Sequence, residues 1–200
     1  MEILIASRNE DKIREIRALI SSLDVSILTP CDFDDLPEVV EDRDTLVGNA
    51  LKKARVLSEL TGLPTIADDT GLFIDALNGE PGVYSSRYAG DSCSYADNRR
   101  KVLHAMNGKD NRTARFITVA VFYIPGKEPL VSEGIVEGII TQQERGDKGF
   151  GYDSIFQITN LQKTYAEMED EEKNLLSHRG LALRNLITKI TQFLNSNNNK

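Results

Sequence analysis

The chain has 200 residues, of which 40% are hydrophobic and 28% charged, a composition that suits one globular domain or two closely packed lobes. Its formal net charge is −7, from 31 acidic and 24 basic residues. Such a surface repels duplex DNA and anionic lipid, so we expect neither nucleic acid nor a membrane as a partner. A local basic cluster could still bind a small phosphate ligand, because salt largely screens a weak global field.

Targeting and redox features predict a cytoplasmic protein. The apolar run at residues 3–6 is too short for a signal peptide, and no stretch approaches the roughly 20 apolar residues that a membrane span needs. Cys31 and Cys93 show neither metal-ligand spacing nor a disulfide framework. We interpret them as two reduced thiols.

The first part of the chain alternates strand and helix patterns. In chain order we expect a buried strand over 2–6, a helix opened by Asn9, a strand over 25–28, an acidic loop over 32–44, and a helix capped by Thr45 and ended by Gly62-Leu63-Pro64. Asn9 precedes isoleucines at helical spacing, and asparagine is among the best N-cap residues.

The remaining chain predicts a long ribbon and a final helix. We expect strands over 65–67 and 72–74 around an acidic turn at 68–71, a turn at 79–82, a weaker helix over 95–106, a strand over 115–124, its antiparallel partner from 130 to about 142, a glycine-rich turn at 146–151, and a helix from Ser177. This order predicts a single mixed α/β domain over residues 1–194, which the ribbon could divide into two lobes. Residues 195–200 form a polar tail that we expect to be frayed.

Several familiar catalytic motifs are absent from the sequence. It has no Walker phosphate loop, dinucleotide-binding glycine fingerprint, nucleophile elbow or metalloprotease helix. His104 and His178 are the only histidines, which excludes a zinc site built from several histidines. Any metal must therefore be a hard cation held by carboxylates.

The first candidate site is Ser7-Arg8-Asn9-Glu10-Asp11-Lys12, between the first strand and the first helix. A helix N-terminus attracts anions through its unpaired N–H groups and its dipole. Ser7 and Asn9 add donors, and Lys12 adds a charge one turn into the helix. The structural alternative is a capped helix with a solvated lysine.

The second candidate is Asp68-Asp69-Thr70-Gly71. Adjacent carboxylates repel each other unless a cation or a hydrogen-bond network offsets their charge. Mg²⁺ usually takes one or two carboxylates plus substrate phosphates, so Asp69 is a candidate ligand and Glu41 in the acidic loop a second one. An ordinary aspartate-rich turn is the alternative.

Two further segments could bind a base. Gly149-Phe150-Gly151-Tyr152-Asp153 allows close backbone approach, and Phe150 or Tyr152 could stack on a purine. Lys173 lies upstream of Ser177-His178-Arg179, and an arginine near a base favours a carbonyl edge because it only donates. A glycine hairpin with core aromatics and a helix start with surface charges are the structural alternatives.

Taken together, these pieces resemble the inosine triphosphate pyrophosphatases, also called non-standard purine NTP pyrophosphatases. Five motifs in order carry the resemblance, from residue 4 to about residue 190. They are Ser7, Asn9, Lys12 and Glu15; Asn49-Ala50 with Lys53-Ala54; Ala67-Asp68-Asp69-Thr70-Gly71-Leu72 followed by Asp75, Leu77, Gly79, Pro81-Gly82, Ser86 and Arg87-Tyr88; Gly149-Phe150-Gly151-Tyr152-Asp153; and Ala166-Glu167-Met168, Glu172-Lys173, Ser177-His178-Arg179 and Ala182.

The chain departs from the family pattern at three positions. Gly48 stands where the family often has Glu, so we place no ligand there. Thr70 replaces a Ser and keeps the hydroxyl, and Ser154 replaces a Pro, which could loosen the turn slightly. None of these departures removes a side-chain group that the reaction needs, provided that Glu41 supplies the second carboxylate.

The resemblance implies a long mixed sheet with flanking helices, two lobes with the active site in the cleft between them, and a homodimer. The implied reaction converts an NTP such as ITP, dITP or XTP and water to the monophosphate and pyrophosphate, with Mg²⁺ as cofactor. It implies Glu41 and Asp69 as metal ligands, and Asp69, Lys12 and Lys173 as catalytic residues. The implied substrate-binding residues are Ser7, Arg8, Asn9, Glu10, Asp11, Lys12, Thr70, Phe150, Gly151, Tyr152, Asp153, Lys173, His178 and Arg179.

Within this reading, Ser7, Asn9 and Lys12 would hold the triphosphate, and Lys173 would add a positive charge near the phosphates. Asp69 could also activate the water, a role that competes with metal binding. Aromatic and donor side chains would frame the base, namely those of Phe150, Tyr152, His178 and Arg179. Arg87 could be a structural residue or a phosphate ligand.

Three rival functions remain on the sequence alone. A pyrophosphatase for modified pyrimidines shares this architecture, but the Ser-His-Arg segment argues against it. A non-catalytic nucleotide sensor is disfavoured by the retained Asp69, Lys12 and Lys173. A nucleic-acid-binding role is disfavoured by the acidic balance.

Overall fold

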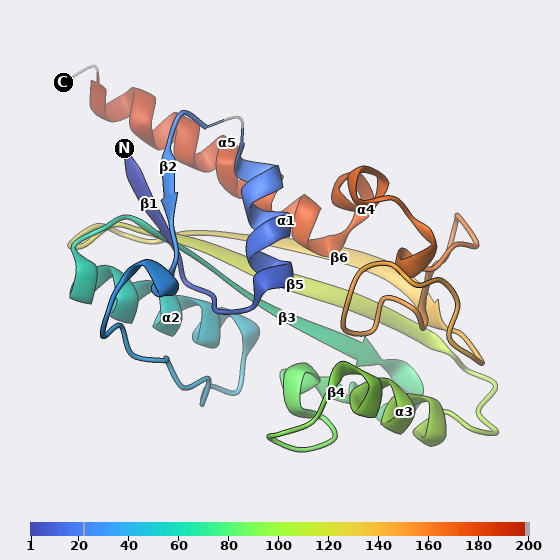
Figure 1. Ribbon diagram of the computed structural model, residues 1–200. Coiled ribbons are helices and arrows are strands. Elements are labelled where there is room, and N and C mark those ends of the chain that lie inside the picture. The colour runs from blue at the N-terminus through green and yellow to red at the C-terminus, as the bar shows by residue number, and fades with distance from the viewer. Residues whose placement is uncertain (22, 199–200) are drawn as a thin grey trace. The chain divides into compact units, whose positions relative to one another are not determined.

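The computed structural model describes residues 1–21 and 23–198, and these residues contain one mixed seven-stranded sheet (Figure 1). The strands are β1 (Glu2–Ile5), β2 (Ser26–Leu28), β3 (Thr65–Ile74), β4 (Pro81–Gly82), β5 (Thr113–Tyr123), β6 (Leu130–Ile140) and β7 (Phe156–Ile158). Their order is β2-β1-β3-β5-β6-β7, and β4 also pairs with β3. β1 pairs in parallel with β2 and β3, whereas β4 and β7 pair antiparallel with β3 and β6. The predicted mixed α/β class is confirmed.

The helices begin where the sequence provides a cap. They are α1 (Glu10–Ile20), α2 (Leu46–Thr61), α3 (Tyr95–Ala105), α4 (Asp170–Leu176) and α5 (His178–Asn198), with 3₁₀ turns at Pro30–Asp32, Asp75–Leu77, Ser85–Arg87 and Tyr165–Glu167. Asn9 accepts a hydrogen bond from the backbone N–H of Lys12, and Thr45 accepts one from that of Gly48. Gly62 ends α2 in the left-handed conformation at φ 70°, where glycine carries no Cβ penalty. The predicted caps are confirmed.

Some predicted boundaries are wrong. Residues 68–71 are not a turn, because β3 continues through them without a break from Thr65 to Ile74. The short elements β4, β7 and α4 were missed because two to seven residues give too little periodicity. The final helix continues to Asn198, so residues 195–198 of the predicted tail are helical, and residues 199–200 lie outside the described part.

The chain divides into two compact units. Unit 1 comprises Met1–Asp69, Thr118–Gly134 and Arg179–Lys200. Its core joins the isoleucines of β1 and α1 to β5 and to the apolar stripe of α5, including Leu183 and Leu186. In Figure 1, α1 and α5 lie on one side of β1 and β3, and α2 lies on the other side. The part of β3 that belongs to unit 1, residues 65–69, therefore has helices on both sides.

Unit 2 comprises Thr70–Ile117 and Ile135–His178. Its core is aromatic: Phe116 packs edge-on against Phe156 with ring centroids 4.6 Å apart, and Phe156 stacks on Tyr165 at 5.3 Å. Among the described residues of the whole chain, no helix combines the length and apolar character needed to cross a membrane.

Candidate active site

The predicted phosphate turn connects β1 to α1 in unit 1. Its polar side chains hold the turn itself, because the N–H of Asn9 donates to Ser7 Oγ at 3.2 Å and the N–H of Lys12 donates to Asn9 Oδ1 at 3.1 Å. Arg8 is exposed and donates to the Leu36 carbonyl at 2.5 Å. The turn therefore has fixed geometry at a helix N-terminus, which favours an anion.

The other two members of the turn lie on its outer side. Glu10 is exposed. Asp11 accepts a hydrogen bond from Arg14 at 2.9 Å, a surface pair along α1. The structure therefore brings Ser7, Asn9 and Lys12 together as the core of the turn.

Asp68 lies in a buried charge network of unit 1. Its carboxylate accepts from Arg179 Nε at 3.0 Å and lies 3.5 Å from Lys12 Nζ. Arg179 Nη1 also donates to Glu15, and both Asp68 and Arg179 are only 2% exposed. Burial opposes ionisation of Asp68, but the charges of Lys12 and Arg179 prevail and hold its pKa well below the ordinary value. Asp68 is therefore an anion at neutral pH that contacts two cations.

Asp69 has a different environment although it is the next residue. Its Oδ2 accepts a hydrogen bond from the side-chain amide of Asn49 on α2 at 3.1 Å. Burial raises the pKa of the Asp69 carboxyl above its ordinary value, in spite of the opposing charges of Lys53 and Lys12, and the Glu41 charge adds to the rise. A buried carboxylate with a raised pKa is a stronger proton acceptor than an exposed one.

Glu41 lies in the acidic loop of unit 1 and faces the same charge cluster. Lys53 on α2 forms an ion pair with the Glu41 carboxylate and donates to the Asp68 carbonyl oxygen at 2.6 Å. Burial raises the pKa of Glu41, but the charges of Lys53 and Lys12 and the hydrogen bond from Lys53 together outweigh burial, and the net pKa is lowered. Burial likewise opposes the charge of Lys53, whereas the Glu41 and Asp69 carboxylates raise its pKa. The pKa values of Glu41, Lys53 and Asp69 therefore depend on one another's charges.

The chemistry of this cluster fits a hard divalent cation. Glu41 and Asp69 offer carboxylate oxygens, the donors that Mg²⁺ prefers, and burial together with the Glu41 charge raises the pKa of Asp69. The described residues contain no group of three or more His, Cys, Asp or Glu side chains arranged around one metal position. A site that completes its shell with water and substrate phosphates needs only one or two carboxylates.

In unit 2, the predicted glycine turn is held by its own aspartate. Asp153 Oδ2 accepts from the Phe150 N–H at 2.8 Å and forms a buried ion pair with Lys173 Nζ at 2.6 Å. The ammonium group of Lys173 also lies 4.7 Å from the centre of the Phe150 ring. Gly149 has φ +69°, and a Cβ there would come within 2.1 Å of Asp153 Oδ2. Glycine is thus required, and Lys173 is engaged within the turn.

Tyr152 attaches the same turn to the rest of unit 2. It is buried, and its hydroxyl donates to the Ser85 carbonyl at 2.7 Å. The hydroxyl of Ser85 accepts from the Leu72 N–H at 2.8 Å, which continues the link into β3 just beyond the half-buried Thr70. Phe150 is half-buried, so it is the more accessible of the two aromatic rings. Gly151 is anchored through its carbonyl, which accepts from Arg99 at 3.0 Å.

His178 is a core residue of unit 2. Its ring stacks on Phe116 with centroids 4.4 Å apart, lies 5.8 Å from the Tyr165 ring, and the residue is 4% exposed. His178 and Arg179 are neighbours in sequence, but the first packs against aromatic rings and the second against carboxylates. This pair is therefore fixed by packing as well as by charge.

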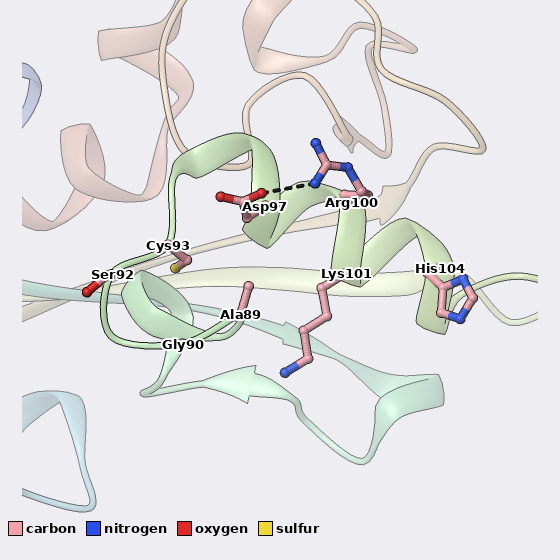
Figure 2. A pocket seen from close by; sticks show the side chains of 8 residues that line it. All are labelled: Ala89, Gly90, Ser92, Cys93, Asp97, Arg100, Lys101 and His104. Atoms are coloured by element: carbon pink, nitrogen blue, oxygen red, sulfur yellow. Dashed lines mark hydrogen bonds and ion pairs between the residues drawn. The ribbon is translucent and has the colours of Figure 1, made fainter.

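Unit 2 also contains a hollow of about 660 Å³ beside α3 (Figure 2). It is lined by Ala89, Gly90, Ser92, Cys93, Asp97, Arg100, Lys101 and His104, none of which belongs to the predicted site. Arg100 pairs with Asp97 at 2.9 Å, and Lys101 donates to the Tyr88 carbonyl. Two of its cations are thus engaged in local contacts.

Sequence reasoning assigned no role to several residues that hold these groups. Asn49, Lys53 and Glu15 belong to the matched motifs, but the motifs do not say which side chains these residues contact. Ser85 and Arg99 gave no such signal, because their partners Tyr152 and Gly151 are 67 and 52 residues away in sequence.

Comparisons with known proteins agree on one family. The family model described as the Ham1 family matches residues 3–189. A dITP/XTP pyrophosphatase of Lactiplantibacillus plantarum is 46% identical, over 96% of this chain and 95% of the relative. Among solved structures, a HAM1 protein from Coxiella burnetii superposes with a TM-score of 0.88 at 41% identity, over 96% of this chain and 99% of that one. A nucleoside-triphosphatase / dITP/XTP pyrophosphatase from Mycobacterium abscessus gives 0.72 at 36% identity, over 88% and 93%. The chain therefore belongs to the Ham1 family.

Proposed function

We propose that this protein hydrolyses non-standard purine nucleoside triphosphates such as ITP, dITP and XTP to the monophosphate and pyrophosphate. Its membership of the Ham1 family, with relatives named dITP/XTP pyrophosphatase, supports this substrate class. One observation carries the chemistry: two adjacent carboxylates have different partners, since Asp68 accepts from Arg179 and lies 3.5 Å from Lys12, whereas Asp69 accepts from the neutral amide of Asn49. This difference favours Asp68 as a fixed negative charge and Asp69 as the proton acceptor.

In this proposal Asp69 is the group that accepts the proton of the attacking water, a role that competes with its binding of Mg²⁺. Glu41 and Asp69 are also the residues that would hold Mg²⁺. When bound, Mg²⁺ supplies positive charge that neutralises the phosphate oxygens. Lys53 and Lys12 keep the surrounding carboxylates ionised and in place.

The triphosphate is bound at the N-terminus of α1. Ser7 and Asn9 keep the turn in the shape that exposes N–H donors, and Lys12 contributes a charge from the first turn of the helix. Lys12 is held near this position by Asp68, 3.5 Å away. This contact supports the proposal that Lys12 binds the triphosphate.

The base is recognised by the Phe150–Asp153 turn together with His178 and Arg179. Phe150 offers an aromatic face, and Lys173 stabilises it from behind through the ion pair with Asp153. Donors that meet the 6-oxo group of hypoxanthine or xanthine would meet an amino group in ATP, and each unpaired buried donor costs about 1–3 kcal/mol. Two such mismatches give roughly a hundredfold rejection of ATP or more.

The proposal includes a second copy of the chain as partner and a cytoplasmic location. The first is supported by the resemblance to a family of homodimers, and the second by the two cysteines outside any disulfide framework. Light scattering on the purified protein tests the dimer.

A substrate panel tests the function. Pyrophosphate release is measured with ITP, dITP, XTP, GTP, ATP and a modified pyrimidine triphosphate, each with Mg²⁺ and with excess chelator. We expect fast release from the first three in Mg²⁺ and none in chelator. A preference for the modified pyrimidine triphosphate would indicate a pyrophosphatase for modified pyrimidines. Nucleotide binding without pyrophosphate release would indicate a non-catalytic sensor.

A further inference from the structure

The candidate ligand Glu41 lies on a segment with no regular structure of its own. Between the 3₁₀ turn at Pro30–Asp32 and the start of α2 at Leu46, the described chain forms neither helix nor strand. A metal site needs its ligands held to within a fraction of an ångström, and a loop gives no backbone ladder to do this. Something outside the loop must therefore fix Glu41.

Helix α2 provides that support through one face. Asn49, Lys52 and Lys53 follow each other at i, i+3 and i+4, so their side chains lie together. All three contact the segment 40–43. The contacts are Arg43 N–H to Asn49 Oδ1 at 2.9 Å, Lys52 Nζ to the Val40 carbonyl and to Asp42 at 2.8 Å each, and the ion pair of Lys53 with Glu41.

Asn49 differs from the two lysines because its second partner is the side chain of the other candidate ligand, Asp69. Its Nδ2 donates to Asp69 Oδ2 at 3.1 Å, and the residue is completely buried. The backbone N–H of Arg43 can only donate, so it requires the amide oxygen on its side and directs the amide nitrogen to Asp69. One side chain thus connects the loop that carries Glu41 to the other candidate ligand.

Gly48 allows this close approach. A Cβ at this position would lie 2.9 Å from Arg43 Cβ and 2.9 Å from Thr45 Oγ1, closer than such atoms come. The absence of a side chain at Gly48 thus leaves room for Arg43 to lie close to α2.

We propose that Asn49 is a positioning residue that sets the separation of Glu41 and Asp69. Gly48, which has no side chain, allows the segment 40–43 to pack closely against α2. This inference rests on the proposed function, in which those two carboxylates hold Mg²⁺. Outer partners of metal ligands commonly change metal affinity by about 10–100-fold when they are removed.

The test is a double-mutant cycle on Mg²⁺ binding without nucleotide. The melting temperature is titrated with MgCl₂ for wild type, Asn49→Ala, Glu41→Gln and the double variant, because an ion that binds the folded state raises the melting temperature. We expect Asn49→Ala to raise the half-effective MgCl₂ concentration about tenfold. In the Glu41→Gln background the same change should have less than about a twofold effect, because there is no longer a ligand pair to position. Additive effects would contradict the proposal, as would a wild-type melting temperature that Mg²⁺ does not change.

Two further variants separate positioning from general destabilisation. Gly48→Ala keeps every hydrogen-bonding side chain and adds only a Cβ, 2.9 Å from Arg43 Cβ and from Thr45 Oγ1, so it should bind Mg²⁺ more weakly than wild type. Its melting temperature without Mg²⁺ reports its stability separately. Asn98→Ala is the matched control, because Asn98 is another buried helical asparagine. Its side chain accepts from the Ala89 N–H at 2.8 Å and donates to the Ser86 carbonyl at 3.1 Å, so these bonds involve no carboxylate.

Asn98→Ala should lower the melting temperature and leave the half-effective MgCl₂ concentration unchanged. An equal Mg²⁺ effect from Asn98→Ala, or an unchanged one from Gly48→Ala, would overturn the proposal. Pyrophosphate release by wild type reports separately on the proposed function: release with additive binding effects rejects only the role of Asn49, and no release from any triphosphate rejects the pyrophosphatase.

Discussion

Replacing Arg179 by methionine should strongly destabilise the protein. Its guanidinium group bonds Asp68 at 3.0 Å and also donates to Glu15, with side-chain exposures of 3%, 1% and 10% for the three residues. Methionine keeps much of the side-chain volume and removes the charge. Two buried carboxylates would then lose their shared cation, although Lys12 remains 3.5 Å from Asp68.

Removing one member of a buried ion pair typically costs about 3–5 kcal/mol, because the partner charge stays buried. In a chain of this size each kcal/mol lowers the melting temperature by about 2–4 °C, so we expect a decrease of roughly 6–20 °C. The control is Arg100→Met. Arg100 pairs with Asp97 at 2.9 Å, but its side chain is 75% exposed. Surface pairs contribute about 0–1 kcal/mol, so the control should barely change the melting temperature.

Urea and thermal unfolding at pH 7 measure both variants. A loss for Arg179→Met no larger than that for Arg100→Met would refute the buried network. At a temperature where the variant is folded, kcat/KM for ITP, GTP and ATP then tests the base contact. The predicted contact requires that the ITP-over-ATP preference falls much more than the ITP-over-GTP preference, whereas equal losses would leave Arg179 a structural or phosphate residue.

The remaining predictions concern the carboxylates and Lys173. Asp69→Asn should reduce kcat more than tenfold, a barrier change above about 1.4 kcal/mol, without lowering the melting temperature, because burial already penalises the Asp69 charge. Lys173→Met leaves Asp153 buried without its cation and should raise the KM for dITP more than it lowers kcat; a normal KM would disconnect the turn from base binding. Asp68 has a folded pKa below its unfolded one, so its contribution to stability is full above the unfolded value and is lost as the pH falls through the folded value. Urea unfolding from pH 7 to pH 3 should therefore show a weaker pH dependence in Asp68→Asn.

Features that depend on nearby residues were predictable from the sequence. Asn9 and Thr45 were identified as caps because each interaction spans three residues, and both caps are present. The apolar spacing of α1 gave its buried face, including Ile16 and Ile20. The missed contacts are distant: Arg179 meets Glu15 across 164 residues and Asp68 across 111. A single sequence contains no local pattern that reports such a pairing.

Gly71 illustrates how a correct observation led to a wrong element. Gly after two aspartates is typical of a turn, and we predicted one at 68–71. In the structure Gly71 lies inside β3, and a Cβ there would come within 2.7 Å of the Gly82 carbonyl oxygen. The glycine is required by the close packing of residue 82, which pairs with β3. A glycine in a strand marks a close backbone approach as readily as a turn does.

The difference between a turn and a strand decides which carboxylates can share a cation. In a turn, Asp68 and Asp69 could both face one ion. In β3, successive side chains point to opposite faces of the sheet. Asp68 therefore meets α1 and α5 through Lys12 and Arg179, whereas Asp69 meets α2 through Asn49. Because Asp68 is committed to two protein cations, a site with two carboxylate ligands must take its second one from another segment. In the proposed site, Glu41 would be that second ligand: Lys53 of helix α2 pairs with it, and the same helix contacts Asp69 through Asn49.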